Sequence, residues 1–381
     1  MRVGFFTEVY HPVVNGIVAS IDGLACGLRA LGHQVYCFAP RVPGYEERDE
    51  PVFRMPSLPL PVPAPYRLTL PVVSRRNRHA IINRLDILHA HSPFVTGWMA
   101  VRYARRLRIP LVYTYHTQLE EYAHYVPFEP HATRRAASTL TRSFANLTDA
   151  VIVPTASMRD HLVDLGVTVR VEIIPSGIDL TRFSSGTRNS QLRASLGVRD
   201  GERMLLFVSR LAREKNVDLL IDAMRACSVP ARLIIAGDGP ERAALEARAA
   251  EHRVADRIRF LGPVERAELP DLYASADAFV FPSVTETQGL VLVEALAAGA
   301  WVVAADAKPV REVLDGAGRL VPPAPAAFAD AFAQVPVSPD PGETAKACAA
   351  AARYSIERQA ERVGELYTDL TRTYVRYTIG T

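Results

Sequence analysis

Two cations and two carboxylates in the second half of the chain have the types and spacing of a site for a sugar carried on a diphosphate. Arg210 and Lys215 follow an apolar run that reads as a buried strand. An Arg fork and a Lys point charge can neutralise a diphosphate and stabilise the charge that develops as it leaves. Glu286 and Glu294 stand further along, and carboxylates accept hydrogen bonds from sugar and ribose hydroxyl groups. The alternative for the cations is an exposed pair at a helix start, with Glu214 as local partner.

The two carboxylates belong to a segment that reads as a loop after a strand, followed by an apolar helix. Gly289 lets the backbone approach a ligand, and the Leu290 amide would lie at the helix start, where phosphate oxygens bind well. Glu294 lies inside the apolar helix, so its burial requires a partner, either a ribose diol or a neighbouring arginine. The donor-binding residues predicted in this segment are Glu286, Thr287, Gln288, Gly289, Leu290 and Glu294.

Two further turns of the same half follow predicted strands. After one strand, Gly237 and Gly239 would let a tight turn lie close to a nucleoside, although a turn without any ligand explains them equally well. After another strand, the backbone around Val264 could read a base edge or form only a loop. Ser209, at the end of the strand before the two cations, completes the predicted donor site.

Polar and aromatic groups follow three predicted strands of the first half. Asn15 and Gly16 lie in a turn that feeds a helix, where the Gly16 amide could face a phosphate or an acceptor, or belong to an ordinary turn. His116 follows a buried strand among Tyr, Gln and Glu residues and is the best candidate to touch the transferred sugar. His89 and His91 follow another strand, and packing is the favoured role of His89. The predicted acceptor-side residues are Asn15, His91, Tyr115, His116, Gln118 and Glu120, and the predicted catalytic residues are His116, Arg210, Lys215 and Glu286.

Short apolar runs alternate with amphipathic segments along the chain, in two series that meet near residues 178–189. Such alternation predicts parallel sheets covered by helices on both faces, with ligands beyond the carboxyl ends of the strands. The expected fold is α/β, with two doubly wound Rossmann-like domains facing across a cleft. The predicted domains are 1–178, joined by the final helix at about 360–381, and 179–359. The proline-dense stretch 51–71 is predicted to be an extended loop.

Composition narrows the class of protein. The chain has 381 residues and 49% hydrophobic content, which suits two globular domains. No apolar run is long enough to span a membrane, the N-terminus does not read as a signal peptide, and the four cysteines lack metal or disulfide spacing, so we expect a cytoplasmic location. Residues 1–178 hold 19 arginines against 14 acidic residues, a net charge of +5. An anionic membrane, an acidic polymer or solubility could each account for it, and we expect no nucleic-acid partner.

Together these residues resemble the family-4 retaining glycosyltransferases of GT-B fold, over nearly the whole chain. The most specific element is the paired-glutamate segment with the Ser-Arg…Lys segment upstream. The resemblance implies that Arg210 and Lys215 bind the donor diphosphate. It implies that Glu286 contacts the donor sugar and that Glu294 binds the ribose. It also implies that no metal or other cofactor is required, which agrees with the absence of an Asp-x-Asp motif.

The same resemblance bears on the sugar and the acceptor. It implies that His116 lies by the sugar at the reaction centre and that Gly16 lies in the loop over the phosphates. Many members have Phe where this chain has Gln288, and with the segment 115–125 this resembles the branch that glycosylates diacylglycerol and related lipids. The segment 98–107 reads as a basic amphipathic helix, suited either to an anionic membrane or to core packing. Peripheral docking on the inner face of the membrane is therefore expected.

The predicted function is transfer of a hexose, with glucose favoured, from a UDP-linked rather than a GDP-linked donor to a lipid hydroxyl, giving an α-glycoside. One alternative is a transferase that uses UDP-glucose or GDP-mannose on a soluble glycan or small molecule. Others are a sugar-nucleotide epimerase or hydrolase and a non-catalytic sensor. A dehydrogenase is disfavoured because no G-x-G-x-x-G follows the first strand. The oligomeric state is left open.

Overall fold

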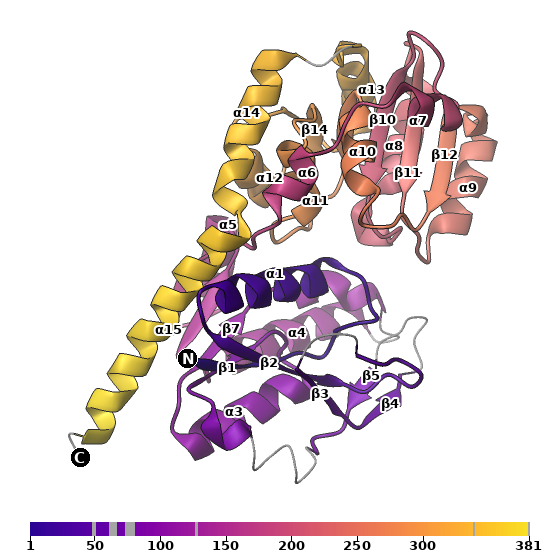
Figure 1. The fold of residues 1–381 in the computed structure, drawn as a ribbon. Coiled ribbons are helices and arrows are strands. Elements are labelled where there is room, and N and C mark those ends of the chain that lie inside the picture. The colour runs from indigo at the N-terminus through magenta and orange to yellow at the C-terminus, as the bar shows by residue number, and fades with distance from the viewer. Residues whose placement is uncertain (48–50, 61–66, 73–80, 126–128, 338–339, 380–381) are drawn as a thin grey trace. The chain divides into compact units, whose positions relative to one another are not determined.

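The computed structural model describes residues 1–47, 51–60, 67–72, 81–125, 129–337 and 340–379, and the chain divides into two compact units. Unit 1 comprises Met1–Gly177 and Ile356–Thr381, and unit 2 comprises Ile178–Ser355. Each unit has one parallel β-sheet with helices on both faces, so the predicted pair of doubly wound α/β domains is confirmed (Figure 1). Within the described ranges, no helix is long and apolar enough to cross a membrane.

The sheet of unit 1 has seven strands in the order β3-β2-β1-β6-β7-β8-β9, all parallel. The direction of winding changes between β1 and β6, which is where doubly wound sheets open a ligand site beyond the strand ends. The strands are β1 (Arg2–Phe6), β2 (Gln34–Pro40), β3 (Val52–Met55), β6 (Ile87–Ala90), β7 (Leu111–Thr114), β8 (Ala150–Val153) and β9 (Arg170–Ile173).

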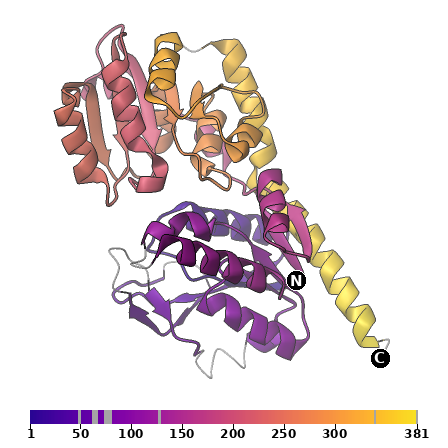
Figure 2. The same ribbon diagram turned by 180° about the vertical axis from the view of Figure 1, so that it is seen from behind.

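Helices cover the two faces of this sheet with separate apolar cores. One core joins the sheet to α1 (Gly16–Ala30) and to the last helix, α15 (Ile356–Ile379). Glycine allows these two helices to approach closely, because a Cβ on Gly27 would lie 2.6 Å from the Cβ of Ala360. The other core joins the sheet to α3 (Val95–Leu107), α4 (Pro130–Ala145) and α5 (Ala156–Asp164) (Figure 1, and from behind in Figure 2).

The stretch 51–71 was predicted to be an extended loop, and this prediction is wrong for its described parts, 51–60 and 67–71; residues 61–66 lie outside the described residues. Its first part is the edge strand β3, and β4 (Ser57–Pro59) pairs antiparallel with β5 (Arg67–Thr69). Prolines are tolerated at sheet edges and strand ends, which explains how a proline-dense stretch can hold short strands. The Glu8 carboxylate anchors this hairpin, since it accepts hydrogen bonds from the backbone N–H of Thr69 (3.1 Å) and of Thr96 in the first turn of α3 (3.0 Å).

The sheet of unit 2 has six parallel strands in the order β12-β11-β10-β13-β14-β15. The strands are β10 (Arg203–Val208), β11 (Ala231–Ala236), β12 (Ile258–Gly262), β13 (Ala278–Phe281), β14 (Val302–Ala305) and β15 (Arg319–Val321). The central pair, β10 and β13, brings together segments that two intervening strands separate in sequence. The loops after these two strands therefore meet at the carboxyl edge of the sheet.

Two apolar cores also sandwich this second sheet. One face packs against α8 (Val217–Ala226), α9 (Arg242–Glu251) and α13 (Pro325–Gln334). The other face packs against α6 (Leu180–Ser184), α10 (Leu269–Ser275), α11 (Leu290–Ala297), α12 (Lys308–Leu314) and α14 (Pro341–Ala351). Among the described residues, the other short helices are α7 (Ser190–Ser195), η3 (Arg213–Lys215), η4 (Ala255–Arg257) and η5 (Ala352–Tyr354) in unit 2, and η1 (Ile82–Arg84) and η2 (Leu119–Tyr125) in unit 1.

Candidate active site

The predicted cations lie in the loop after β10, which continues into the single turn η3. Arg210 donates a 2.7 Å hydrogen bond to the Glu214 carboxylate, so the local partner considered from the sequence is present. The Glu214 side chain is buried, whereas that of Arg210 is 37% exposed. A buried carboxylate therefore binds one terminal nitrogen of a partly exposed guanidinium group, and the other nitrogens can donate to an anion.

Lys215 and Glu286 form an ion pair across the two central strands of unit 2. Lys215 Nζ lies 2.6 Å from Glu286 Oε1, and the two side chains are 16% and 13% exposed. The structure thus brings together one cation and one carboxylate that lie far apart in sequence. In this low-dielectric setting the two charges compensate each other.

The two loops are also joined through the backbone of Glu214. Its carbonyl oxygen accepts hydrogen bonds from Ser283 Oγ (3.3 Å) and Thr285 Oγ1 (3.4 Å), both in the loop after β13. Asn216 adds a third link by donating to the Pro282 carbonyl (3.3 Å). These contacts fix the cations relative to Glu286. The sequence offered only a weak signal for them, a run of small polar residues after a strand.

Helix α11 starts at the carboxyl end of β13, as the sequence predicted. Gly289 stands at its N-cap with a φ of 82°, a left-handed conformation that favours glycine. Thr287 and Leu290 are half-buried, and Gln288 is buried. A Cβ on Gly289 would lie 3.6 Å from Cγ of Glu286, so the start of α11 lies beside the Lys215–Glu286 pair, an arrangement suitable for phosphate oxygens.

Glu294 is buried inside α11 and is 7% exposed. Its Oε2 accepts a 3.0 Å hydrogen bond from the hydroxyl group of Tyr273, which sequence reasoning did not identify. Burial raises the pKa of Glu294 to about 7, and the positive charges of Arg266 and Arg182 oppose that rise. The sequence predicted an arginine or a ribose diol as the partner of Glu294, and the structure adds the hydroxyl group of Tyr273.

The structure gives the predicted glycine turn a packing role. A Cβ on Gly237 would lie 1.9 Å from the carbonyl oxygen of Ser209, and one on Gly239 would lie 2.2 Å from that of Leu211. Backbone hydrogen bonds join the same loops, from Ser209 N to Ala236 O (3.1 Å) and from Leu211 N to Asp238 O (2.9 Å). The glycines therefore set the position of the loop that carries Arg210. Contact of these glycines with a nucleoside stays a prediction.

Val264 lies in the loop after β12, half-buried against the core that contains α10 and α11. Gly262, which ends β12, accepts a 2.7 Å backbone hydrogen bond from Gly237. The two turns therefore form one continuous edge beside the Ser209 loop. Whether Val264 meets a base stays a prediction.

In unit 1, Asn15 is the N-cap of α1. Its side chain accepts a 2.9 Å hydrogen bond from Val18 N, which satisfies one of the unpaired amides at the helix start. Gly16, the first residue of α1, is exposed. The side chain of Asn15 therefore caps the helix start beyond β1. Contact of the exposed Gly16 with a phosphate or an acceptor stays a prediction.

Two of the predicted histidines meet at the carboxyl edge of the sheet in unit 1. His91 Nδ1 lies 3.0 Å from His116 Nε2, and their rings stack with centroids 5.3 Å apart. Burial lowers the pKa of His116 to about 4, and burial with the two neighbouring histidines also lowers the pKa of His91, so both rings are neutral near pH 7. A neutral imidazole can donate one hydrogen bond and accept another, which suits a contact with a sugar hydroxyl.

His89 lies behind this pair and has the packing role that the sequence favoured. It is fully buried, and its two ring nitrogens lie 2.5 Å from the hydroxyl oxygen of Tyr367 and 2.6 Å from that of Thr114. Its ring stacks on His91 with centroids 4.3 Å apart. Because Tyr367 belongs to α15, the last helix of the chain helps to fix the histidines of unit 1.

Two predicted acceptor-side residues, Tyr115 and Glu120, are buried. Glu120, on η2, forms an ion pair with His161 of α5. The Tyr115 ring stacks on His161 with centroids 6.3 Å apart, and burial together with the Glu120 charge raises the pKa of Tyr115. These contacts fasten η2 to the rest of unit 1. The half-buried Gln118 precedes η2, and direct contact of these three residues with an acceptor stays a prediction.

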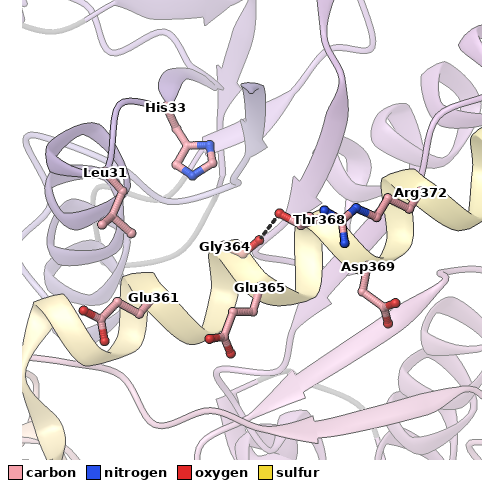
Figure 3. Close-up of a pocket in the computed structure, with 8 residues that line it drawn as sticks. All are labelled: Leu31, His33, Glu361, Gly364, Glu365, Thr368, Asp369 and Arg372. Atoms are coloured by element: carbon pink, nitrogen blue, oxygen red, sulfur yellow. Dashed lines mark hydrogen bonds between the residues drawn. The ribbon is translucent and has the colours of Figure 1, made fainter.

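A shallow groove of about 450 Å³ lies elsewhere in unit 1, between the α1–β2 turn and α15 (Figure 3). His33, which lines it, precedes β2, so the groove is at the amino edge of the sheet, opposite the predicted site. Its lining residues are Leu31, His33, Glu361, Gly364, Glu365, Thr368, Asp369 and Arg372. Across the described part of the chain, no group of three or more His, Cys, Asp or Glu residues is arranged to hold a metal ion.

The chain has two doubly wound parallel sheets, and cations paired with carboxylates lie beyond the central strands of the second sheet. These features define a two-domain transferase of GT-B fold. The sequence model named Glycosyltransferase Family 4 matches residues 14–182, and the model named Glycosyl transferases group 1 matches residues 189–355. The chain belongs to this family of glycosyltransferases, as the sequence resemblance indicated.

Individual relatives agree with this assignment. An α-monoglucosyldiacylglycerol synthase of Acholeplasma laidlawii is 37% identical over 314 residues, which cover 78% of each chain. A GDP-mannose-dependent α-mannosyltransferase of Mycobacterium tuberculosis is 34% identical over 322 residues, which cover 82% of this chain and 81% of the relative. The sucrose-phosphate synthase structure of Thermosynechococcus elongatus superposes with a TM-score of 0.80 at 21% identity, covering 98% of this chain and 99% of that one, and supports the fold.

Proposed function

We propose that this glycosyltransferase moves glucose from a UDP-linked donor to the hydroxyl group of a diacylglycerol-type lipid, with retention of configuration and without a metal ion. The observation that carries the donor half is the grouping of Arg210, Lys215 and Glu286 at one edge of the sheet in unit 2. The lipid half is supported by the relative from Acholeplasma laidlawii, whose name specifies a diacylglycerol product.

The ion pair between Lys215 and Glu286 suggests how the donor is received. When the diphosphate binds, its oxygens compete with Glu286 for Lys215, and the released carboxylate can accept hydrogen bonds from the sugar. Arg210 adds a second positive charge, so the two side chains supply the charge stabilisation that a metal ion would otherwise provide. In this proposal Glu294 binds the ribose, and Glu286 contacts the sugar through hydrogen bonds without attacking it covalently.

The transfer proceeds at one face of the sugar. The acceptor oxygen forms a bond to the anomeric carbon as the bond to the diphosphate breaks, and the electron pair stays with the diphosphate. The acceptor proton passes to the departing phosphate oxygen. Both relatives carry α in their names, and an α product from the ordinary α-linked nucleotide sugars means that configuration is retained.

The exposed face of α3 supports docking on an anionic membrane. One face of the helix, which includes Met99 and Ala100, is buried in the core, and the basic face is exposed. Trp98 is 44% exposed, and Arg102 and Arg105 continue its stripe along the helix. Aromatic and arginine side chains on one helical face suit the interface between anionic head groups and hydrocarbon.

The test is to incubate the protein with UDP-glucose or GDP-mannose and liposomes of anionic phospholipid, with and without diacylglycerol, and to measure the nucleoside diphosphate released. Release that needs UDP-glucose and diacylglycerol together, with an α-linked glycolipid product, supports the proposal. Release from GDP-mannose would favour the second candidate, a mannosyltransferase, which the relative from Mycobacterium tuberculosis supports. Release that ignores lipid would overturn the proposed acceptor.

A further inference from the structure

Tyr273 is a fully buried tyrosine of unit 2 that connects its helix to a second helix through the carboxylate of Glu294. Its hydroxyl group donates a 3.0 Å hydrogen bond to Oε2 of Glu294. Tyr273 is 0% exposed and belongs to α10, whereas Glu294 is 7% exposed and belongs to α11. Within the described part of the chain no other group donates a hydrogen bond to this carboxylate, so one of its oxygens is held and the other is not.

The tyrosine ring is itself held in place by packing. Phe183 of α6 meets it edge-on at a centroid distance of 5.9 Å, and the ring of Phe279 on β13 lies at a centroid distance of 5.5 Å. A ring fixed in this way presents its hydroxyl group in one direction, which limits the rotation of the carboxylate it contacts. Glu294 is therefore oriented before any ligand arrives.

We propose that Tyr273 is a positioning residue for the donor nucleoside, which fixes the Glu294 carboxylate so that its second oxygen receives the ribose hydroxyl groups. The inference rests on the proposed function, in which Glu294 binds the ribose. Tyr273 is too deeply buried to touch the nucleotide and acts only through Glu294. A preorganised acceptor gains affinity because the side chain loses no further rotational freedom on binding.

A purely structural role for the same hydrogen bond makes a different prediction. If the bond only joins α10 to α11, its loss lowers the stability of the protein and weakens the binding of all nucleotides alike. If the bond orients the carboxylate, its loss weakens the binding only of nucleotides that carry ribose hydroxyl groups. The discriminating quantity is the ratio of the dissociation constants of 2′,3′-dideoxy-UDP and UDP.

The variant is Tyr273→Phe, which removes the hydroxyl group and keeps the ring contacts with Phe183 and Phe279. Titration calorimetry at pH 8 should show UDP bound about 3- to 10-fold more weakly than by the unaltered protein, as expected when one side chain must lose its rotational freedom on binding. The affinity for dideoxy-UDP should be nearly unaffected. The control is Tyr354→Phe, which removes the hydroxyl group of another buried tyrosine of unit 2. That hydroxyl group donates to the backbone carbonyl groups of Glu312 (3.4 Å) and Val313 (3.5 Å), and the Arg353 guanidinium lies beside the ring.

The variant Glu294→Gln separates the ribose-binding role of Glu294 from the positioning role of Tyr273. If Glu294→Gln narrows the ratio of dissociation constants and Tyr273→Phe does not, the positioning role is overturned while the ribose role stands. If Glu294→Gln leaves the ratio unchanged, Glu294 does not bind the ribose, and that part of the proposed function fails first. Equal weakening of UDP and dideoxy-UDP by Tyr273→Phe would also contradict the proposal. Thermal unfolding of each variant establishes that the fold is retained.

Discussion

Breaking the ion pair between Lys215 and Glu286 should destabilise unit 2 of the ligand-free protein by a measurable amount. The 2.6 Å distance makes it a short charge-assisted hydrogen bond, and both side chains are less than one-fifth exposed. Exposed pairs contribute about 0–1 kcal/mol, and removing one partner of a fully buried pair costs about 3–5 kcal/mol. We therefore expect an intermediate coupling free energy of about 1.5–3 kcal/mol, the range of hydrogen bonds to charged groups.

The assay is a double-mutant cycle with Lys215→Met, Glu286→Gln and the double variant. The chain has two tryptophans, Trp98 in unit 1 and Trp301 in unit 2. In a Trp98→Phe background, Trp301 fluorescence reports only the unfolding of unit 2 in urea. This choice avoids the mixed transitions that a two-domain protein otherwise shows.

A matched control comes from an exposed ion pair in the same unit. Arg242 Nε lies 2.9 Å from Glu246 Oε1 on the surface of α9, with side chains 34% and 47% exposed. Its cycle should give a coupling of about 0.3–0.5 kcal/mol, typical of such helix pairs. If the Lys215–Glu286 cycle gives no more than this control, the ligand-free site is not held together by that pair, and the proposed exchange of partners on donor binding loses its basis.

Three further predictions concern the donor site. Arg210→Ala should lower turnover by about 10²–10³-fold, because the guanidinium acts on the diphosphate. It should also lower the free energy of unfolding of unit 2 by about 1.5–3 kcal/mol, because the buried Glu214 carboxylate loses a hydrogen bond. Near-normal turnover of the folded variant in steady-state kinetics would contradict this. Gly237→Ala should lower the unfolding temperature and abolish turnover. The φ of Gly237 is 137°, and a Cβ at this position would lie 1.9 Å from the Ser209 carbonyl oxygen. A calorimetric scan that matches the parent protein would refute this prediction. Glu294→Gln should be more stabilising at pH 8 than at pH 4 by about 3 kcal/mol. Burial raises the pKa of Glu294 from its usual 4.5 to about 7, so ionisation of the unfolded chain opposes folding as the pH rises through that window. Urea unfolding at both pH values measures the difference, and an effect independent of pH would show that the carboxyl group is not perturbed.

The strands of both sheets could largely be predicted from the sequence, because buried parallel strands are short apolar runs between amphipathic helices. The run 204–209 was expected to be a strand, and β10 is Arg203–Val208. The strand β3 was missed because Val52–Met55 lies among prolines and is mostly half-buried at a sheet edge. The strand β15 was missed because it has only three residues, Arg319–Val321. Edge and very short strands carry little of the apolar signal on which such predictions depend.

The residue types of the donor site could be predicted, but their pairings could not. Arg210 and Lys215 follow β10 and Glu286 follows β13, and both facts are visible in the sequence. That β10 and β13 are neighbours depends on the strand order, which alternation of strands and helices does not reveal. The same holds for the contact between His91 and His116, whose strands β6 and β7 are adjacent in unit 1.

The buried carboxylate of Glu294 is explained by a ligand better than by the fold. Every other residue of α11 is apolar, so an apolar side chain at this position would complete the packing of the helix. The carboxylate instead opposes folding, since its pKa stands near 7 and the charges of Arg266 and Arg182 offset the effect of burial only in part. Tyr273 meets one of its oxygens. A group that lowers the stability of the free protein, yet is oriented by a fully buried partner, has the features of a preorganised binding group. Nucleotide binding should therefore favour the ionised form of Glu294, so that the affinity for UDP relative to its dideoxy analogue rises as the pH increases from 6 to 8.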